Sequence, residues 1–356
     1  MSRVAGEKEE RLVVTEFFER GYAGDGERGG QVKELWSWGG QKGKEGGGKM
    51  SRWWWVAGLL GLSLWGCVTV KVNLWEEAEP LREQVVAGRG GDKILLVDLS
   101  GLIIESPRRR LLWWPGVVSA ARVKEELDKA AKDRRVKGVV LRINSPGGTV
   151  SGADLIYHEL QTFKKERGVP VVACFLGLAA SGGYYVAQAA EAIVASPTNL
   201  TGSIGVVAMK PNLKGLLDRL GVGSDVVKTG EWKDFWSPFR PATEKEKERM
   251  QEIIEEFYRR FLEVVAQGRG LSRKEVEKLA DGRIFTAPEA KELGLVDKVG
   301  YLEEAIELAK EKAGLREARV VMYYRPGSYR PSIYSWAQEL LGEMSGPQFL
   351  YLWCPE

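Results

Sequence analysis

Apolar runs of strand length alternate with helix-like segments through the middle of the chain. Residues 94–99, 136–143 and 171–176 are mainly apolar, as expected of strands buried on both faces of a sheet. Between them, residues 117–132 have apolar positions at helical spacing with Lys and Glu on the other face, and residues 151–165 also form a predicted helix. This alternation predicts an α/β fold in which a parallel sheet is wrapped by helices.

The same reading extends toward the C-terminus. We predict a short strand over 192–195, a strand running into a turn over 226–234, and a long helix over 243–267. Shorter helices are expected over 272–279 and 287–293. An apolar stripe along the long helix indicates a core or subunit-interface face. It consists of Met250, Ile253, Ile254, Phe257, Phe261 and Val264.

The first part of the chain has a different composition. Residues 1–49 are rich in Gly, Glu and Lys and are expected to be disordered, or an extension that precedes the true start at Met50. Residues 50–70 are predicted to be a signal or membrane-anchor segment, because positions 53–70 carry no charge. That run of 18 residues is at the lower limit for crossing a bilayer.

Cys67 is a candidate for lipidation, because Leu64-Trp-Gly-Cys67 resembles a bacterial lipobox. Tryptophan fits that motif poorly, so a retained helix is favoured over a lipid on Cys67. Polar residues 71–92 are expected to be a linker and residues 93–315 the folded domain. The apolar C-terminal extension, 316–356, is expected to pack on that domain or on a neighbouring subunit.

Composition excludes several classes of function. The chain has 52 basic and 49 acidic residues, a balance that argues against nucleic acid as a partner. The three cysteines, Cys67, Cys174 and Cys354, are too few and too scattered for a disulfide framework or a zinc site. The only histidine, His158, cannot supply a multi-histidine metal site, so we expect no metal.

Ser181 lies where the predicted strand over 171–176 passes into a helix predicted over 184–191. It is followed by two glycines, which permit close backbone approach. A serine at such a junction has its hydroxyl beside free backbone N–H groups, the arrangement of a nucleophile with an oxyanion hole. The glycine-rich segment 144–148 also follows a strand, so both segments can face one site. The alternative is an ordinary serine N-cap.

A nucleophilic serine needs a base, and His158 lies inside a predicted helix, where it is expected to be partly exposed. A lysine can act instead if burial lowers its pKa toward neutrality. Spacing alone does not choose among the lysines after Ser181. Lys233 is a candidate because three neighbouring aromatic residues can shield it from water, although an exposed turn lysine is the alternative. Those neighbours are Trp232, Phe235 and Trp236.

Four segments in order resemble the bacterial signal peptide peptidase A (SppA) family over roughly residues 93–308. They are Asn144-Ser-Pro-Gly-Gly148, Ala180-Ser-Gly-Gly-Tyr-Tyr185, Thr201-Gly-Ser-Ile-Gly205 and Gly230-Glu-Trp-Lys-Asp234. The resemblance implies a Clp-protease/crotonase-like fold and a membrane-anchored serine peptidase that uses no cofactor. The single copy of these motifs is similar to the short form of the family.

The resemblance also assigns roles to residues. It implies that Ser181 is the nucleophile, Lys233 the general base, and Ser203 a residue that orients the lysine amine. It implies that Gly148 and Gly182 supply the oxyanion-hole N–H groups. In the short form of the family, neighbouring subunits of a ring-shaped homo-oligomer supply Ser and Lys.

For this chain the resemblance further implies hydrophobic peptide substrates such as cleaved signal peptides. It places a single N-terminal anchor in the bacterial cytoplasmic membrane, with the catalytic domain on the extracytoplasmic side. Two alternatives remain, a crotonase-type acyl-CoA enzyme without a catalytic serine and an inactive scaffold of the same fold. A membrane anchor together with Ser181, Lys233 and Ser203 argues against both.

Overall fold

The computed structural model describes residues 79–106 and 116–325. The predicted extension over 1–49, the predicted anchor over 50–70 with Cys67, and most of the C-terminal extension lie outside these residues. Within the described ranges, no helix is both long enough and apolar enough to cross a membrane.

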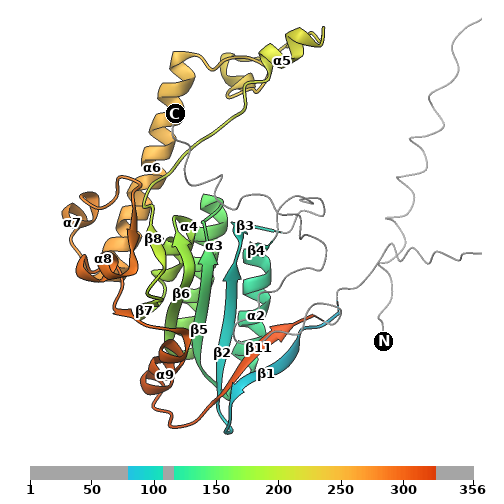
Figure 1. The fold of residues 1–356 in the computed structure, drawn as a ribbon. Helices are drawn as coiled ribbons and strands as arrows, with labels where there is room; N and C mark the ends of the chain where they lie inside the picture. Colours follow the sequence, from blue (N-terminus) through green and yellow to red (C-terminus); the bar gives the residue numbers. More distant parts are fainter. Residues whose placement is uncertain (1–78, 107–115, 326–356) are drawn as a thin grey trace, which may run out of the picture. The chain divides into compact units, whose positions relative to one another are not determined.

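A single large sheet forms the centre of the domain (Figure 1). All its strand pairs are parallel except β1·β11 and β8·β9, so the predicted parallel sheet is confirmed. The main path runs β1 (Arg82–Gly88), β11 (Arg319–Tyr324), β2 (Lys93–Ser100), β5 (Val136–Ser145), β6 (Val171–Ala180), β7 (Ala192–Ala195) and β10 (Lys298–Val299). Beyond it, β8 (Leu200–Gly202) pairs with β6, β9 (Ile284–Thr286) pairs with β8, and β3 (Leu102–Ile104) pairs separately with β4 (Val117–Ser119).

Successive residues of each strand point to opposite sides of the sheet, and the side chains on each side pack into a separate hydrophobic cluster. In β2, Leu95 and Val97 belong to the larger core cluster, whereas Ile94 and Leu96 belong to a second cluster on the other face. The larger cluster includes residues of α2 (Ala120–Lys132), α3 (Val150–Arg167), α4 (Gly182–Ala187) and α6 (Glu244–Arg269). The second cluster contains α9 (Leu302–Lys312). The remaining helices are α5 (Lys214–Arg219), the 3-10 helix η1 (Glu231–Asp234), α7 (Arg273–Glu277) and α8 (Ala287–Glu292).

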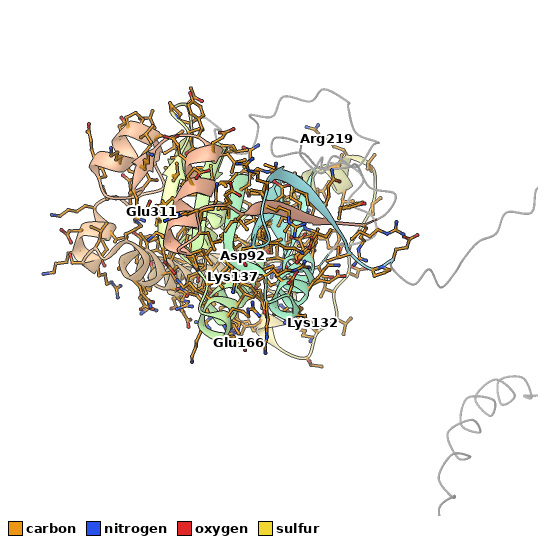
Figure 2. The ribbon with its side chains drawn as sticks, turned by 90° about the horizontal axis from the view of Figure 1, so that it is seen from below. Asp92, Lys132, Lys137, Glu166, Arg219 and Glu311 are labelled. Atoms are coloured by element: carbon orange, nitrogen blue, oxygen red, sulfur yellow. The ribbon has the colours of Figure 1, made fainter. Side chains whose placement is uncertain are left out.

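The two ends of the parallel strands differ in chemistry. Figure 2 shows the end of the sheet at which β2 and β5 begin. The charged residues that it labels there lie at or near the starts of strands and the ends of helices. Ser181 follows the last residue of β6 and therefore lies at the opposite, carboxyl end, where open α/β sheets place their sites. The labelled residues at the first end are Asp92, Lys132, Lys137, Glu166 and Glu311.

Several predicted elements differ from the observed ones. Residues 226–230 form no strand: Val226 and Val227 are exposed, and only the turn that follows is regular, as η1. The apolar pair has the composition of a strand, but no strand among the described residues pairs with it. The helix predicted over 184–191 ends earlier than expected, at Ala187, the last residue of α4.

Two segments that the sequence predicted as a linker and as the start of a helix instead form the strands β1 and β4. The described part of the predicted linker over 71–92 contains β1, which pairs antiparallel with β11. The polar composition of β1 fits this position, because β1 is an edge strand with one side open to water. The helix predicted over 117–132 begins only at Ala120, since its first three residues form β4 and Ser119 is the N-cap.

Several charged side chains are buried around Asp98 of β2. Arg142 is fully buried and its Nε donates to Asp98 Oδ1 at 2.8 Å. Arg122 donates to the Asp98 backbone oxygen, and its Nε lies 3.6 Å from a Glu126 carboxylate oxygen. Glu126 is only 5% exposed, and burial raises the pKa of its carboxyl to about 7.

We expect Glu126→Gln to remove a pH dependence of stability. The unfolded carboxyl ionises above about pH 4.5, whereas the folded one stays protonated to about pH 7. The unfolded state then binds fewer protons, so the free energy of unfolding falls between these pH values, by roughly 3 kcal/mol in total, and levels off above them. Chemical unfolding of both proteins from pH 4.5 to 8 measures the difference. Asp128→Asn, an exposed change in the same helix, is the control, and an unchanged pH profile in Glu126→Gln would contradict the assignment.

Candidate active site

Ser181 has a strained backbone at the junction of β6 and α4. Its φ is 51° and ψ is −119°, a conformation that residues other than glycine rarely adopt and that clusters at functional sites. Its N–H donates to the Gly202 oxygen at 2.9 Å, which ties the junction to β8. The hydroxyl makes no cap hydrogen bond to α4. Ser181 is therefore not an ordinary N-cap, and its hydroxyl is available for other chemistry.

Two backbone N–H groups lie beside this serine. Gly182 is the first residue of α4, where an N–H has no acceptor within the helix. A Cβ built on Gly182 would lie 3.2 Å from the Gly148 nitrogen, so the two amides are close neighbours. Within the described part of the chain, neither N–H donates a hydrogen bond. Paired free donors beside a serine are the arrangement that stabilises an oxyanion.

The glycines of the first segment are required by close packing. At Gly147, where φ is 107°, a Cβ would lie 2.9 Å from the Ser181 Cβ and 2.8 Å from the Gly182 nitrogen. At Gly148 a Cβ would lie 1.9 Å from the Ile103 backbone oxygen. Only glycine lets this segment approach Ser181 on one side and β3 on the other.

Ser181, Gly148 and Gly182 line one pocket of about 390 Å³. The structure thus brings together the predicted nucleophile and both glycines that the family resemblance assigned to the oxyanion hole. Their relation to catalysis remains a prediction, argued below.

The walls of this pocket come from α3, α4 and α6 and include residues that the sequence did not identify as part of a site. Tyr185 packs edge-on against Phe261 and donates its hydroxyl hydrogen to the Asp154 carboxylate. Arg260 donates to the same carboxylate at 3.3 Å. Burial raises the pKa of Tyr185, which therefore stays protonated as a donor. The apolar stripe predicted on the long helix was the signal for this wall, since it contained Phe257 and Phe261.

Ser203 lies next to the Ser181 junction along the sheet. It follows Gly202, the residue whose carbonyl accepts the Ser181 N–H, and β8 is paired with β6 directly before both serines. Ser203 has a φ of 49°, and its N–H donates to the Arg283 oxygen at 2.8 Å. It is half-buried and is not among the residues that line the pocket.

Lys233 lies on η1, away from this grouping. It is exposed, does not line the Ser181 pocket, and makes no hydrogen bond to Ser181 or Ser203 within the described residues of one chain. Its neighbours pack on one another with ring centroids 5.9 Å apart in each pair: Phe235 is tilted against Trp232 and stacked on Trp236. These aromatic side chains do not bury Lys233 in a single chain, where the predicted shielding is therefore incomplete.

Backbone strain links the three regions. Among the described non-glycine residues, positive φ occurs at Ser181, at Ser203 and at Trp236, three positions after Lys233. Each such residue costs of order 1–3 kcal/mol and persists only where the surroundings impose it. The strain is thus confined to the nucleophile candidate, its neighbouring serine and the turn that carries the lysine.

Other candidate groups lie outside the pocket. His158 is an exposed residue of α3, as its helical position predicted. Cys174 is buried in β6, where burial raises its pKa to about 12. No cluster of metal-binding side chains occurs among the residues for which the structure gives positions.

Comparison with known proteins identifies the family. The model of peptidase family S49 matches residues 163–316, and the Clp protease model matches residues 118–198. A protein of Enterococcus faecium named as a candidate signal peptide peptidase SppA is 35% identical over 268 residues, which cover 75% of this chain and 77% of that protein. Protease 4 of Haemophilus influenzae is 37% identical over 232 residues, 65% of this chain and 36% of that protein.

A plant protein is also similar to this chain. The chloroplastic serine protease SPPA of Arabidopsis thaliana is 32% identical over 253 residues, which cover 69% of this chain and 36% of that protein. Both family models include the β6–α4 junction that carries Ser181. The chain therefore belongs to the signal peptide peptidase A family within peptidase family S49, and it is a serine protease with a Clp-protease-like α/β fold.

Proposed function

We propose that the protein is a membrane-anchored endopeptidase in which Ser181 is the nucleophile and Lys233 the general base. The observation that carries this proposal is the strained Ser181, whose uncapped hydroxyl lies in one pocket with the free amides of Gly148 and Gly182. Family membership supports serine chemistry, and no other described serine combines these features.

The proposed chemistry follows from these groups. The neutral Lys233 amine takes the Ser181 proton while Oγ attacks the scissile carbonyl, and the Gly148 and Gly182 N–H groups stabilise the oxyanion. Collapse breaks the C–N bond, and the lysine ammonium returns its proton to the leaving amine. Water then attacks the acyl-enzyme with the same lysine as base, which releases the acid and restores Ser181. Ser203 holds the amine in line during these transfers.

The lysine is proposed to act on the pocket of a neighbouring subunit. We call residues 204–243, which connect β8 to α6 and include η1, the arm. Nine of the sixteen exposed large apolar residues in the described part of the chain belong to it, an unusual density for a surface facing water. A second copy of the chain is the proposed occupant, because Lys233 is exposed here and absent from its own pocket. The nine residues are Val207, Met209, Leu216, Leu220, Val222, Val226, Val227, Trp232 and Phe239.

The proposed substrates are hydrophobic peptides such as cleaved signal peptides. The pocket beside Ser181 supports this, because Val150, Ala153, Phe257 and Phe261 give it largely apolar walls. The name of the Enterococcus relative describes the same substrate class for that protein. The uncharged segment over 53–70 supports an anchor in the bacterial cytoplasmic membrane, with the catalytic domain outside the cytoplasm.

A fluorophosphonate probe tests the nucleophile. We expect the probe to label the wild-type protein in membranes and to leave Ser181→Ala unlabelled, because the probe bonds only to an activated serine oxygen. Ser151→Ala, a change of another serine lining the pocket, is the matched control and should label normally. A crotonase-type enzyme or an inactive scaffold would not be labelled at Ser181, so equal labelling of wild type and Ser181→Ala rejects the proposal.

The same probe locates the domain. A membrane-impermeant fluorophosphonate should label Ser181 in intact spheroplasts of cells that express the full chain. Labelling that appears only after lysis would place the domain on the cytoplasmic side and contradict the proposed orientation.

A further inference from the structure

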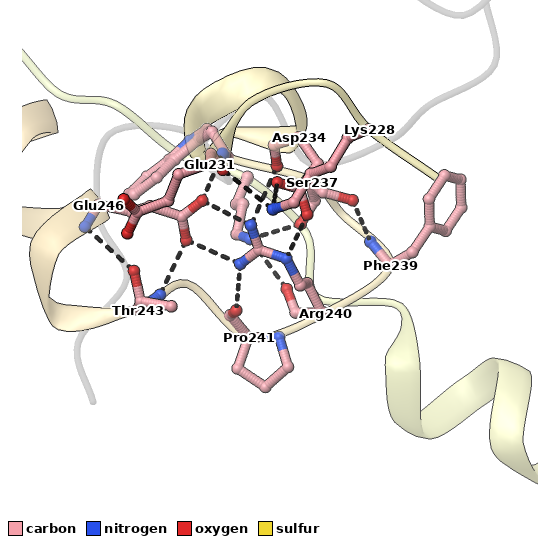
Figure 3. A network of polar contacts seen from close by, with 11 residues as sticks. Lys228, Glu231, Asp234, Ser237, Phe239, Arg240, Pro241, Thr243 and Glu246 are labelled. Atoms are coloured by element: carbon pink, nitrogen blue, oxygen red, sulfur yellow. Dashed lines mark hydrogen bonds and ion pairs between the residues drawn. The ribbon is translucent and has the colours of Figure 1, made fainter. Parts of the chain in front are cut away.

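The turn that carries Lys233 is held by a cluster of charged side chains (Figure 3). Asp234, the next residue in the chain, accepts from Arg240 Nε at 2.9 Å and from Lys228 Nζ at 2.5 Å through its two carboxylate oxygens. Its backbone oxygen also accepts from Arg240 Nη2 at 3.2 Å. One guanidinium therefore fixes both the side chain and the main chain of the residue beside the lysine.

The same guanidinium joins the turn to α6. Arg240 Nη1 and Nη2 donate to the two oxygens of Glu246 at 2.8 and 2.7 Å, a bidentate pair of the strongest type. Glu246 is only 4% exposed and completes the capping box of α6 with Thr243. Hydrogen bonds from Arg240 hold the pKa of Asp234 well below its usual range and that of Glu246 at about 2. Asp234 and Glu246 therefore both carry a negative charge at neutral pH.

The cluster also contacts Trp236, one of the three residues with a strained backbone. The N–H of Trp236, which has a φ of 59°, donates to Glu246 Oε1 at 3.3 Å. Lys210 donates to the Ser237 and Arg240 backbone oxygens and lies over the Trp236 ring. The turn is therefore fixed relative to α6, whose C-terminal half packs into the core of the same subunit.

We infer that Arg240 is a positioning residue, which holds the Lys233 turn against the start of α6 and so sets where the amine is presented to the neighbouring subunit. Three features favour this role over simple stabilisation of the arm. The arginine binds the residue adjacent to Lys233 rather than a distant part of the arm, and it contacts that residue through both main chain and side chain. Its other partner, Glu246, lies in the first turn of α6, the helix that links the arm to the subunit core. The inference rests on the proposed function of Lys233.

The first test compares Arg240→Gln with Arg249→Gln in the full-length protein. Arg249 lies on α6, the helix that Arg240 contacts, but within the described residues it pairs only with Glu252 on the surface, so it is a matched control. We expect Arg240→Gln to lower kcat on a peptide substrate by on the order of 10- to 100-fold with KM little changed, because misplacing a catalytic group by about 1 Å has effects of this size. Arg249→Gln should retain wild-type kcat, and both variants should be folded and assembled at the assay temperature.

Asp234→Asn provides a second variant with the same expectation. It removes the charge that Arg240 binds and keeps the side-chain shape. Because both substitutions break the same Arg240–Asp234 ion pair, the double variant should be little slower than the slower single variant. Fully multiplicative losses of kcat would show that the two residues act separately and would overturn the inference.

A third test uses mixed assemblies. In a mixture of Ser181→Ala and Lys233→Ala chains, the working lysine belongs to the Ser181→Ala chain. Arg240→Gln should lower activity when it is added to that chain and have little effect when it is added to the Lys233→Ala chain. A general folding defect would lower activity in both placements, and that result overturns the inference.

Lys233→Ala, assayed alone, separates the two hypotheses. Substantial activity in Lys233→Ala would reject the proposed function itself. An inactive Lys233→Ala together with wild-type kcat in Arg240→Gln would reject only the role of Arg240.

Discussion

Mixing Ser181→Ala chains with Lys233→Ala chains is expected to restore peptidase activity that neither variant has alone. Lys233 is exposed and does not line the pocket of its own chain, so we place each active site between two subunits. In a 1:1 random ring, about a quarter of the sites pair an intact serine with an intact lysine. Activity should therefore return to about a quarter of the wild-type value per site when the chains are unfolded together and reassembled.

The controls are each variant reassembled alone and the double variant mixed with wild type. Assembly size is checked by light scattering, so that a failure to assemble is not mistaken for a failure of catalysis. If the mixture stays as inactive as its parts while wild type recovers after the same treatment, each chain uses its own lysine, and the arrangement between subunits is wrong.

Lys233→Arg is expected to be as inactive as Lys233→Ala, a loss of at least about 10³-fold in kcat, comparable to the loss of a general base. A base must accept a proton, and a guanidinium keeps its proton at any working pH. The assay is kcat on one peptide substrate from pH 6 to 10.

Lys214→Arg is the matched control, because Lys214 lies in the same arm but pairs only with Asp218 on α5. It should retain wild-type activity. Substantial activity in Lys233→Arg would show that a positive charge suffices at this position, and Lys233 would not be the base.

The sequence predicted the strand-to-helix junction at Ser181 well because its signals are local. A buried strand, a serine and two glycines specify a strand-to-helix junction with little help from the rest of the chain, and Ser181 lies at that junction. At Gly148, by contrast, glycine is required by contact with Ile103, which lies far from it in the sequence. The parallel strands were predicted equally well. Both faces of the sheet are covered, so these strands are continuous apolar runs that can be recognised in the sequence.

Other features depend on contacts between distant segments and had no local signal. The polar segment that forms β1 becomes a strand only because β11 lies beside it. Val226 and Val227 have the composition of a strand but no partner in the described residues. The bonds of Arg240 to Asp234 and Glu246 join residues that were expected to be separate elements, a strand end and a helix start. The pocket wall of Asp154, Tyr185 and Arg260 likewise combines three helices.

The exposed arm gives the proposed enzyme a form of latency. A single chain has the strained Ser181 and the two free amides in place, but its Lys233 is exposed and does not line their pocket. If Lys233 acts between subunits as proposed, a newly made chain would be inert during export and would gain activity only on assembly with other copies at the membrane. Assembly would then serve this enzyme as removal of an inhibitory segment serves a zymogen, and the rate of proteolysis would depend on the density of chains at the membrane.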